Sequence, residues 1–204
     1  MTVTITSAEL RELNGRPPID DAAAERAVAD LLRALGRDPE GPHLADTPRR
    51  VAHAYREMLT PREFDLTTFP NESGYDELVL ARDIEIQSLC EHHMLPFRGV
   101  AHIGYLPGGR ILGLSKLARV AEMFARDLQV QERLTMQIAD WLDDQLQPRG
   151  VGVVIEAEHM CMSLRGVRSA GSWTTTSALR GLLRESGPAR AEFLELTRAR
   201  ANPR

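Results

Sequence analysis

Two short segments of this sequence hold side chains that could bind a metal ion together. The first, "SLCEHHML" (residues 88–95), contains Cys90, His92 and His93, and the second, "EAEHMCM" (156–162), contains His159 and Cys161. Cysteine sulfur and histidine nitrogen are the ligands that zinc binds in tetrahedral geometry. Because the two segments use both cysteines of the 204-residue chain, the pattern predicts one shared metal site rather than two isolated structural cysteines.

Spacing alone leaves two arrangements of this site open. Cys90 and His93 form C-x-x-H, which one tight turn can present to an ion, and on a strand the side chains of His159 and Cys161 would share a face. All four could close a Cys₂His₂ structural site, or three could bind the metal and leave a position open for catalysis. His92 favours the second arrangement, because acid–base chemistry uses a histidine beside the metal.

A basic pair in the segment "GLSKLARVAEMF" (113–124) could bind an anion. Lys116 and Arg119 are three residues apart in the first part of a predicted helix, and therefore lie on one face. An anion at that helix N-terminus would meet free N–H groups, the helix dipole and both cations. The alternative on this evidence alone is a solvated surface face.

The pattern of apolar residues predicts the elements that must position these groups. Residues at a period of 3.6 predict helices, and alternating or β-branched runs predict strands. Helices are expected at 24–36, 46–59, 113–127 and 129–147, and strands at 78–89, 99–106, 151–161 and 171–181.

The order of these elements is ββααββ behind two N-terminal helices, which predicts an α+β fold with a mainly antiparallel sheet. We expect residues 1–75 to form an N-terminal helical region and residues 76–204 to form the metal-binding domain. A four-stranded sheet with two helices on one face has open edges, and oligomerisation is one way to cover them.

The composition is that of a globular protein and excludes several functions. The chain is 43% hydrophobic and 26% charged, and its formal net charge of −4 argues against a general nucleic-acid-binding protein. We find no apolar run long enough to span a membrane and no secretory signal at the N-terminus, so no membrane partner is expected. Two cysteines, each near a histidine, fit a reducing compartment, and we expect the cytoplasm.

Longer motifs resemble the GTP cyclohydrolase I family from about Ile19 to Leu196. These motifs are "LADTPRRVAHAY", "SLCEHHMLPF", "GLSKLARV", "QVQERLTMQIA", "EAEHMCMSLRGVR" and "TTTSALRG". The resemblance implies the tunnelling fold, in which ββααββ units join side by side into a barrel, usually stacked as a homodecamer. It also implies a zinc hydrolase that opens the imidazole ring of GTP at C8, releases formate and forms 7,8-dihydroneopterin triphosphate, the first step of folate and pterin synthesis.

The resemblance also implies a role for each matching residue. It assigns one zinc per subunit to three protein ligands, with the catalytic histidines beside them, and places the triphosphate, purine and ribose contacts elsewhere in the motifs. The implied metal ligands are Cys90, His93 and Cys161, the catalytic residues are His92 and His159, and the substrate contacts are Ser115, Lys116, Arg119, Gln131, Glu132 and Arg165.

The sequence departs from the family pattern at two positions. Trp173 stands where a smaller or polar residue is expected, and Asp127 stands where a basic residue is common.

Two other functions are alternatives to this one. A non-catalytic, zinc-stabilised assembly protein would need all four Cys and His side chains on the metal and would leave the basic pair unexplained. Another tunnelling-fold purine or pterin enzyme, such as a nitrile reductase, would need a nucleophilic cysteine free of metal.

Overall fold

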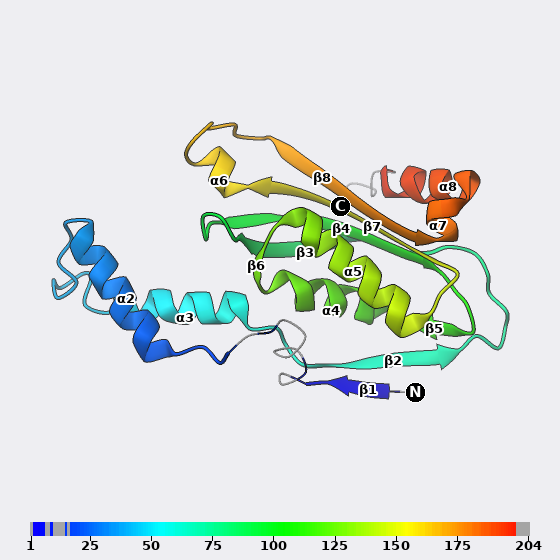
Figure 1. Ribbon diagram of the computed structural model, residues 1–204, viewed down its shortest axis with the longest axis horizontal. Coiled ribbons are helices and arrows are strands. Elements are labelled where there is room, and N and C mark those ends of the chain that lie inside the picture. Colours follow the sequence, from blue (N-terminus) through cyan, green and yellow to red (C-terminus); the bar gives the residue numbers. More distant parts are fainter. Residues whose placement is uncertain (1, 7–8, 10–14, 16, 199–204) are drawn as a thin grey trace.

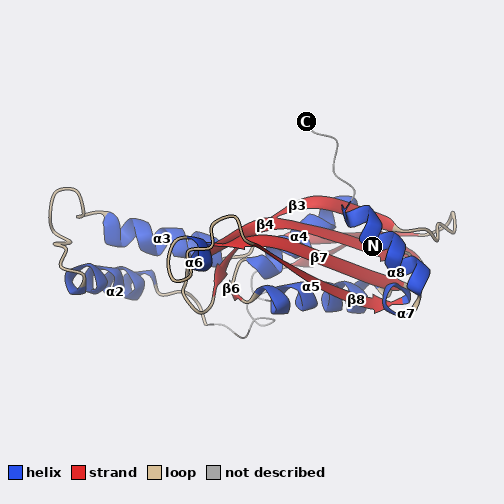
Figure 2. Ribbon diagram, turned by 90° about the horizontal axis from the view of Figure 1, so that it is seen from above, coloured by secondary structure: helices blue, strands red, loops and turns tan. Residues whose placement is uncertain are grey.

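A computed structural model describes residues 2–6, 9, 15 and 17–198. It consists of a main body built on an antiparallel sheet and a helical hairpin that projects from one end (Figure 1). The hairpin comprises α2 (Asp21–Ala34) and α3 (Thr47–Leu59), which agrees with the two predicted N-terminal helices. Figure 2 shows that the hairpin extends beyond the end of the sheet and does not lie on its face.

The main sheet has five strands in the order β6-β3-β4-β7-β8, and every pairing except β3 with β6 is antiparallel. Its strands are β3 (Val79–Cys90), β4 (Pro96–Leu106), β6 (Leu128–Gln129), β7 (Gly150–His159) and β8 (Trp173–Gly181). Helices α4 (Leu114–Ala125) and α5 (Gln131–Leu146) lie between the second and third long strands in sequence. The predicted α+β class and ββααββ order are therefore confirmed, with β6 as an added edge strand.

The core lies between this sheet and helices α4 and α5. On α4 the apolar residues at helical spacing, Leu117, Val120, Ala121 and Phe124, are all buried, and on α5 Leu134, Ile138 and Leu142 are buried. In β7, Val153 and Ile155 alternate into the same core, because successive side chains of a strand point to opposite faces.

Two short helices cover part of the other face of the sheet. These are α7 (Leu182–Glu185) and α8 (Gly187–Arg198). Phe193 of α8 is fully buried there, and a Cβ atom on Gly152 of β7 would lie 2.7 Å from its ring. The glycine therefore allows α8 to pack closely against the sheet.

A second, three-stranded sheet was not predicted from the sequence. It has the order β1-β2-β5 and contains β1 (Thr2–Ile5), β2 (Phe64–Pro70) and β5 (Arg110–Leu112). In β2, Phe64, Leu66 and Thr68 are buried and alternate with Asp65 and Thr67. The region expected to be helical through residue 75 therefore also contains two strands.

A bulge in β3 lies beside a buried histidine of β4, on the face of the sheet that α8 partly covers. The register with β4 shifts between Ala81 and Ile84, and Asp83 has a φ of 56°. The Asp83 N–H donates to Nδ1 of His102, 3.3 Å away, and the His102 side chain is almost fully buried. Burial lowers the pKa of His102, although the carboxylates of Asp83 and Glu156 oppose this shift.

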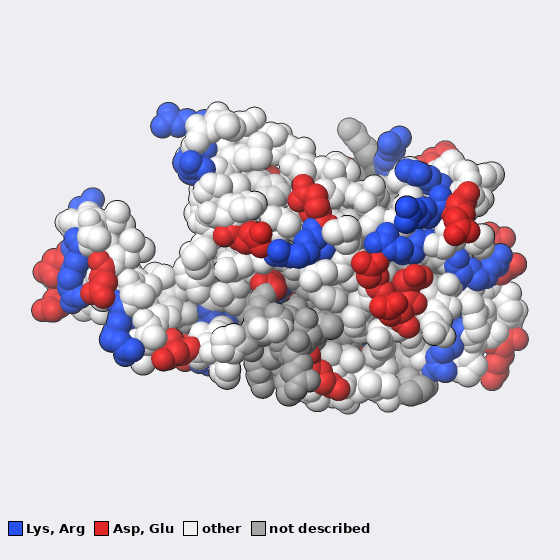
Figure 3. All heavy atoms as spheres, in the orientation of Figure 1, with Lys and Arg blue, Asp and Glu red and all other residues white. Residues whose placement is uncertain are grey.

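The surface shows no concentration of one charge on the face in Figure 3, where basic and acidic side chains are interspersed. Across the described residues, none of the helices combines the length and the apolar character that a membrane crossing requires.

Candidate metal and catalytic site

Three of the predicted residues meet at one end of the main sheet. One ligand atom from each of Cys90, His93 and Cys161 lies within 4.8 Å of the other two. Cys90 is the last residue of β3, His93 lies in the turn that follows, and Cys161 lies in the one-turn helix α6 (Met160–Ser163), directly after β7. Both cysteines are buried and reduced. Segments about 70 residues apart in sequence thus form one cluster.

A tight turn after β3 places His93 beside Cys90. The carbonyl oxygen of Cys90 accepts hydrogen bonds from the N–H of His93 (3.3 Å) and of Met94 (2.8 Å). Met94 adopts a φ of 54°, which reverses the chain. As a result, Nδ1 of His93 lies 3.8 Å from Sγ of Cys90, as the C-x-x-H spacing predicted.

The second pair of predicted residues is arranged differently from the expectation. The strand predicted over 151–161 ends at His159, and Cys161 lies in α6. The two side chains therefore do not share a strand face. Nε2 of His159 instead lies 2.8 Å from Oε1 of Gln131, in the first turn of α5. The group that could hold a metal ion, called the metal-binding cluster below, consists of Cys90, His93 and Cys161 and does not include His159.

The chemistry of this cluster fits zinc. Tetrahedral zinc with bonds of about 2.0–2.3 Å separates its sulfur and nitrogen ligands by roughly 3.3–3.8 Å, close to the spacing of Cys90 and His93. Burial raises the pKa of the Cys161 thiol, and the neighbouring Cys90 raises it further. Two buried thiolates side by side are unfavourable, so a divalent cation between them would supply the missing positive charge.

His159 has a stacking contact in addition to its contact with Gln131. Its imidazole stacks on the ring of Phe97 in β4, with centroids 4.6 Å apart and planes inclined by 13°. The register pairs these two residues across β4 and β7, so the sheet itself sets the stack. Burial lowers the pKa of His159, and the carboxylate of Glu132 opposes this shift. Sequence reasoning missed Phe97, because nothing in "LPF" signals a cross-strand partner 62 positions away.

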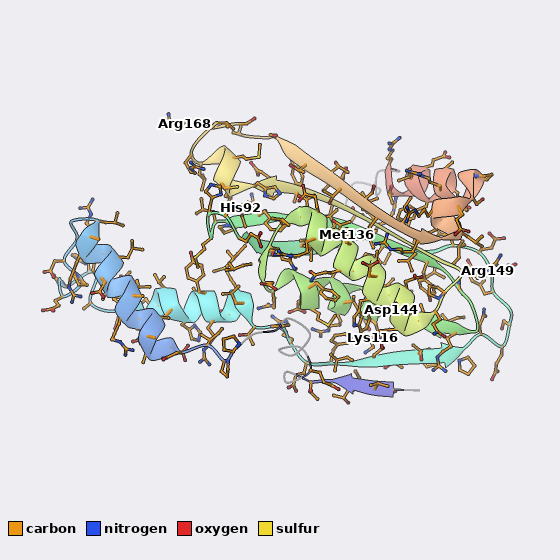
Figure 4. The ribbon with its side chains drawn as sticks, viewed as in Figure 1. His92, Lys116, Met136, Asp144, Arg149 and Arg168 are labelled. Carbon is orange, nitrogen blue, oxygen red and sulfur yellow. The ribbon has the colours of Figure 1, made fainter. Side chains whose placement is uncertain are left out.

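His92 lies on the same turn but is much more exposed. Its side chain is 64% exposed, with Nε2 3.8 Å from a carboxylate oxygen of Glu91 and Nδ1 3.9 Å from Sγ of Cys90 (Figure 4). Glu91 in turn pairs with Arg133 of α5 at 2.6 Å. This ion pair ties the turn to the helix and was not predicted, because its partners are far apart in sequence.

Arg165 reaches the metal-binding cluster. Its Nη1 lies 3.1 Å from Nε2 of His93 and donates to the carbonyl oxygen of Cys161 (3.4 Å). Gln131 and Glu132 also lie nearby, at the start of α5, with the carboxylate of Glu132 acting on His159. The structure thus brings three of the six predicted substrate contacts to this end of the sheet.

The other three predicted contacts lie elsewhere in the same chain. Ser115, Lys116 and Arg119 belong to the first turns of α4, and Arg119 pairs with Glu122 at 3.3 Å. In Figure 4, Lys116 lies on the side of the molecule near β2, well apart from His92. The last residue of α4, Ala125, lies three positions before β6, the edge strand that pairs with the end of β3 at Cys90. At 1.5 Å per residue, Lys116 is about 14 Å from Ala125 along the helix.

Taken together, the sheet, its two covering helices and the Cys/His cluster define an α+β protein with a group at the end of its sheet that could hold a metal ion. A family model for GTP cyclohydrolase I matches residues 24–198. This chain belongs to the GTP cyclohydrolase I family, a family of hydrolytic enzymes, so the resemblance of its motifs is confirmed.

Individual relatives match over nearly their whole length. GTP cyclohydrolase 1 of Mycobacteroides abscessus is 52% identical over 200 residues, covering 94% of this chain and 98% of that protein. The enzyme of Streptomyces coelicolor is 54% identical over 188 residues (89% and 92%), and that of Gloeobacter violaceus 50% over 207 residues (96% and 91%). Among solved structures, the apo archaeosine synthase QueF-Like aligns with a TM-score of 0.43 and 15% identity, covering 51% of this chain and 93% of that one.

Proposed function

We propose that this chain catalyses the GTP cyclohydrolase I reaction. In that reaction the imidazole ring of GTP is opened hydrolytically at C8, formate is released, and the product rearranges to 7,8-dihydroneopterin triphosphate. One observation carries the proposal: three side chains form a cluster that could hold a metal ion, while His159 has a separate hydrogen-bond partner. A purely structural Cys₂His₂ site would place the fourth side chain on the metal.

Zinc is the metal proposed, one ion per chain, held by Cys90, His93 and Cys161. When bound, zinc acts as a Lewis acid and activates water near neutral pH. Two thiols are available as ligands only if they stay reduced, which supports a cytoplasmic location. We assign this chemistry to residues 76–204 as the catalytic unit.

The surrounding residues supply proton transfer and substrate binding in this proposal. His159 accepts and returns a proton near C8, and His92, on the exposed turn, is the second proton carrier. The carboxylate of Glu132 accepts hydrogen bonds from the ring N–H and exocyclic amine of guanine. Arg165, beside the cluster, contacts the triphosphate, to which its guanidinium can bind in bidentate fashion.

The triphosphate contacts on α4 support active sites shared between subunits. Lys116 and Arg119 lie about 14 Å and about 9 Å along α4 from the helix end that precedes β6. A neighbouring copy could supply them. The loop after Cys161 also exposes apolar side chains, with Leu164 and Val167 68% and 72% exposed. A homo-oligomer, and in this family a decamer, would cover such a surface.

A direct assay tests the proposed function. Purified protein is incubated with GTP, the products are oxidised, and neopterin fluorescence and formate are measured. We expect both products in the zinc-loaded protein, their loss after chelation, and their return when zinc is added. Zinc-loaded, folded protein that releases neither formate nor a fluorescent pterin would refute the proposal and favour another purine or pterin enzyme, or an assembly protein.

A further inference from the structure

The side-chain amide of Gln131 is buried, and its orientation is determined by its partners. Its nitrogen Nε2 lies 3.0 Å from the carbonyl oxygen of Ile155, 2.9 Å from that of Thr174 and 3.1 Å from the hydroxyl of Thr176. Main-chain carbonyl oxygens can only accept hydrogen bonds. The end of the amide that faces them must therefore be the NH₂ group, and the oxygen Oε1 must face His159.

This orientation selects one tautomer of His159. Oε1 of Gln131 is only an acceptor and lies 2.8 Å from Nε2 of His159, so Nε2 must carry the proton. In the neutral ring Nδ1 is then the unprotonated nitrogen. No hydrogen bond joins Nδ1 to another residue in the part of the chain that the structure describes. Nδ1 is thus the nitrogen that can accept a proton from a reacting group.

Two threonines complete the arrangement in a fixed direction. The hydroxyl of Thr135 lies 2.7 Å from the carbonyl oxygen of Gln131 and must donate its proton there. It lies 2.6 Å from the hydroxyl of Thr176, to which it can then only act as acceptor. Thr176 therefore donates to Thr135 and keeps its own oxygen lone pair for the NH₂ group of Gln131. The two hydrogens of the Gln131 NH₂ group are thus shared among three acceptors, two carbonyl oxygens and the hydroxyl of Thr176.

We propose that Gln131 is a positioning residue, which holds His159 as the Nε2–H tautomer with Nδ1 free to accept a proton. The carbonyl oxygens of Ile155 and Thr174 fix its amide, and the hydroxyls of Thr135 and Thr176 are compatible with that orientation. In this role Gln131 contacts only Nε2 of the histidine. The residue is 1% exposed, and its NH₂ group donates to main-chain carbonyl oxygens. If the amide turned over, its oxygen would face two carbonyl oxygens and its NH₂ would face Nε2–H. The proposal rests on the proposed function for its catalytic consequence, but the tautomer can be observed without substrate.

The tautomer is measured first in the unmodified chain. Zinc-loaded protein labelled with ¹⁵N-histidine is examined by solid-state NMR without GTP, and the His159 signals are identified by their absence from the His159→Gln spectrum. We expect a protonated Nε2 and an unprotonated Nδ1 at neutral pH. A protonated Nδ1 with a bare Nε2 would overturn the proposal without need of any further variant.

A pair of variants then tests Gln131. Gln131→Met removes the oxygen that accepts from Nε2 of His159, and Thr176→Val is the matched control because it leaves both carbonyl partners of the Gln131 amide in place. With zinc content and folding unchanged, we expect Gln131→Met to show mixed tautomers and a kcat lowered roughly 10-fold or more, and Thr176→Val to keep the parental tautomer.

The outcomes separate this inference from the proposed function. Gln131→Met with the parental tautomer and the parental kcat would refute the role of Gln131. If the parent opens no GTP ring but shows the expected tautomer, and Gln131→Met loses it, the proposed function fails while the positioning of His159 stands. If the ring is opened but the tautomer is the opposite one, the inference fails and the proposed function stands.

Discussion

Two chains that are each inactive should restore activity when they assemble together, if the active site is shared between subunits. One variant, Cys161→Ala, lacks a metal ligand. The other, Lys116→Ala/Arg119→Ala, lacks the basic pair on α4. Lys116 lies about 14 Å along α4 from the helix end that precedes β6. In a shared site, each metal cluster receives its basic pair from another copy.

The expected recovery follows from the geometry. Two charged hydrogen bonds to phosphate are worth roughly 3–6 kcal/mol, so the double variant alone should lose on the order of 100-fold or more in kcat/KM. With equal amounts of both chains mixed at random, half of the sites have an intact metal cluster, and half of these receive an intact basic pair. About one quarter of the parental activity should therefore return.

The assay uses co-expression of the two chains with different affinity tags, tandem purification of mixed oligomers, and the neopterin assay. The matched control combines Cys161→Ala with Cys90→Ala, which damage the same cluster and should restore nothing. Mixed oligomers of the first pair that show no more activity than the sum of their parents would refute a shared site and place the basic pair outside the substrate site.

Three further predictions concern the metal, pH and packing. Cys161→Ala should lose the bound zinc, whereas His159→Ala should keep close to one zinc per chain and lose ring opening by about 100-fold; equal loss of zinc in metal analysis would indicate a Cys₂His₂ site. Because burial lowers the pKa of His102 below its unfolded value of about 6.5, stability should fall as the pH drops through that value. Melting temperatures at about pH 7.5 and 5.5 should therefore differ more for the parent than for His102→Gln, and equal differences would contradict this. Phe193→Ala should destabilise the fold by about 3–5 kcal/mol in denaturant unfolding, since it empties a fully buried site, and a loss below about 1 kcal/mol would show that α8 contributes little.

Much of the fold could be predicted because its pattern is local. The apolar stripe on α4 and the alternation along β7 recur at the periods of a helix and a strand, so both were found close to their observed limits. The pairing of β2 with β5 was missed, because strands that pair across some 40 residues carry little information in either segment alone. The end of β7 at His159 was also missed. The residue pattern over 151–161 carries no turn residue, such as Gly or Pro, at the point where the strand gives way to α6.

The sequence by itself determined which atoms can bind the metal: the C-x-x-H turn and the two cysteines have that chemistry wherever they meet. Only the tertiary structure decided that His159 stays outside the cluster, because α5 brings the amide of Gln131 to its Nε2 across 28 residues. Likewise, the residue types identified Lys116 as an anion-binding candidate, but the direction of α4 across the sheet places it away from the cluster of its own chain. Ligand chemistry belongs to individual side chains, whereas the division of roles among them depends on distances that arise only when the chain folds.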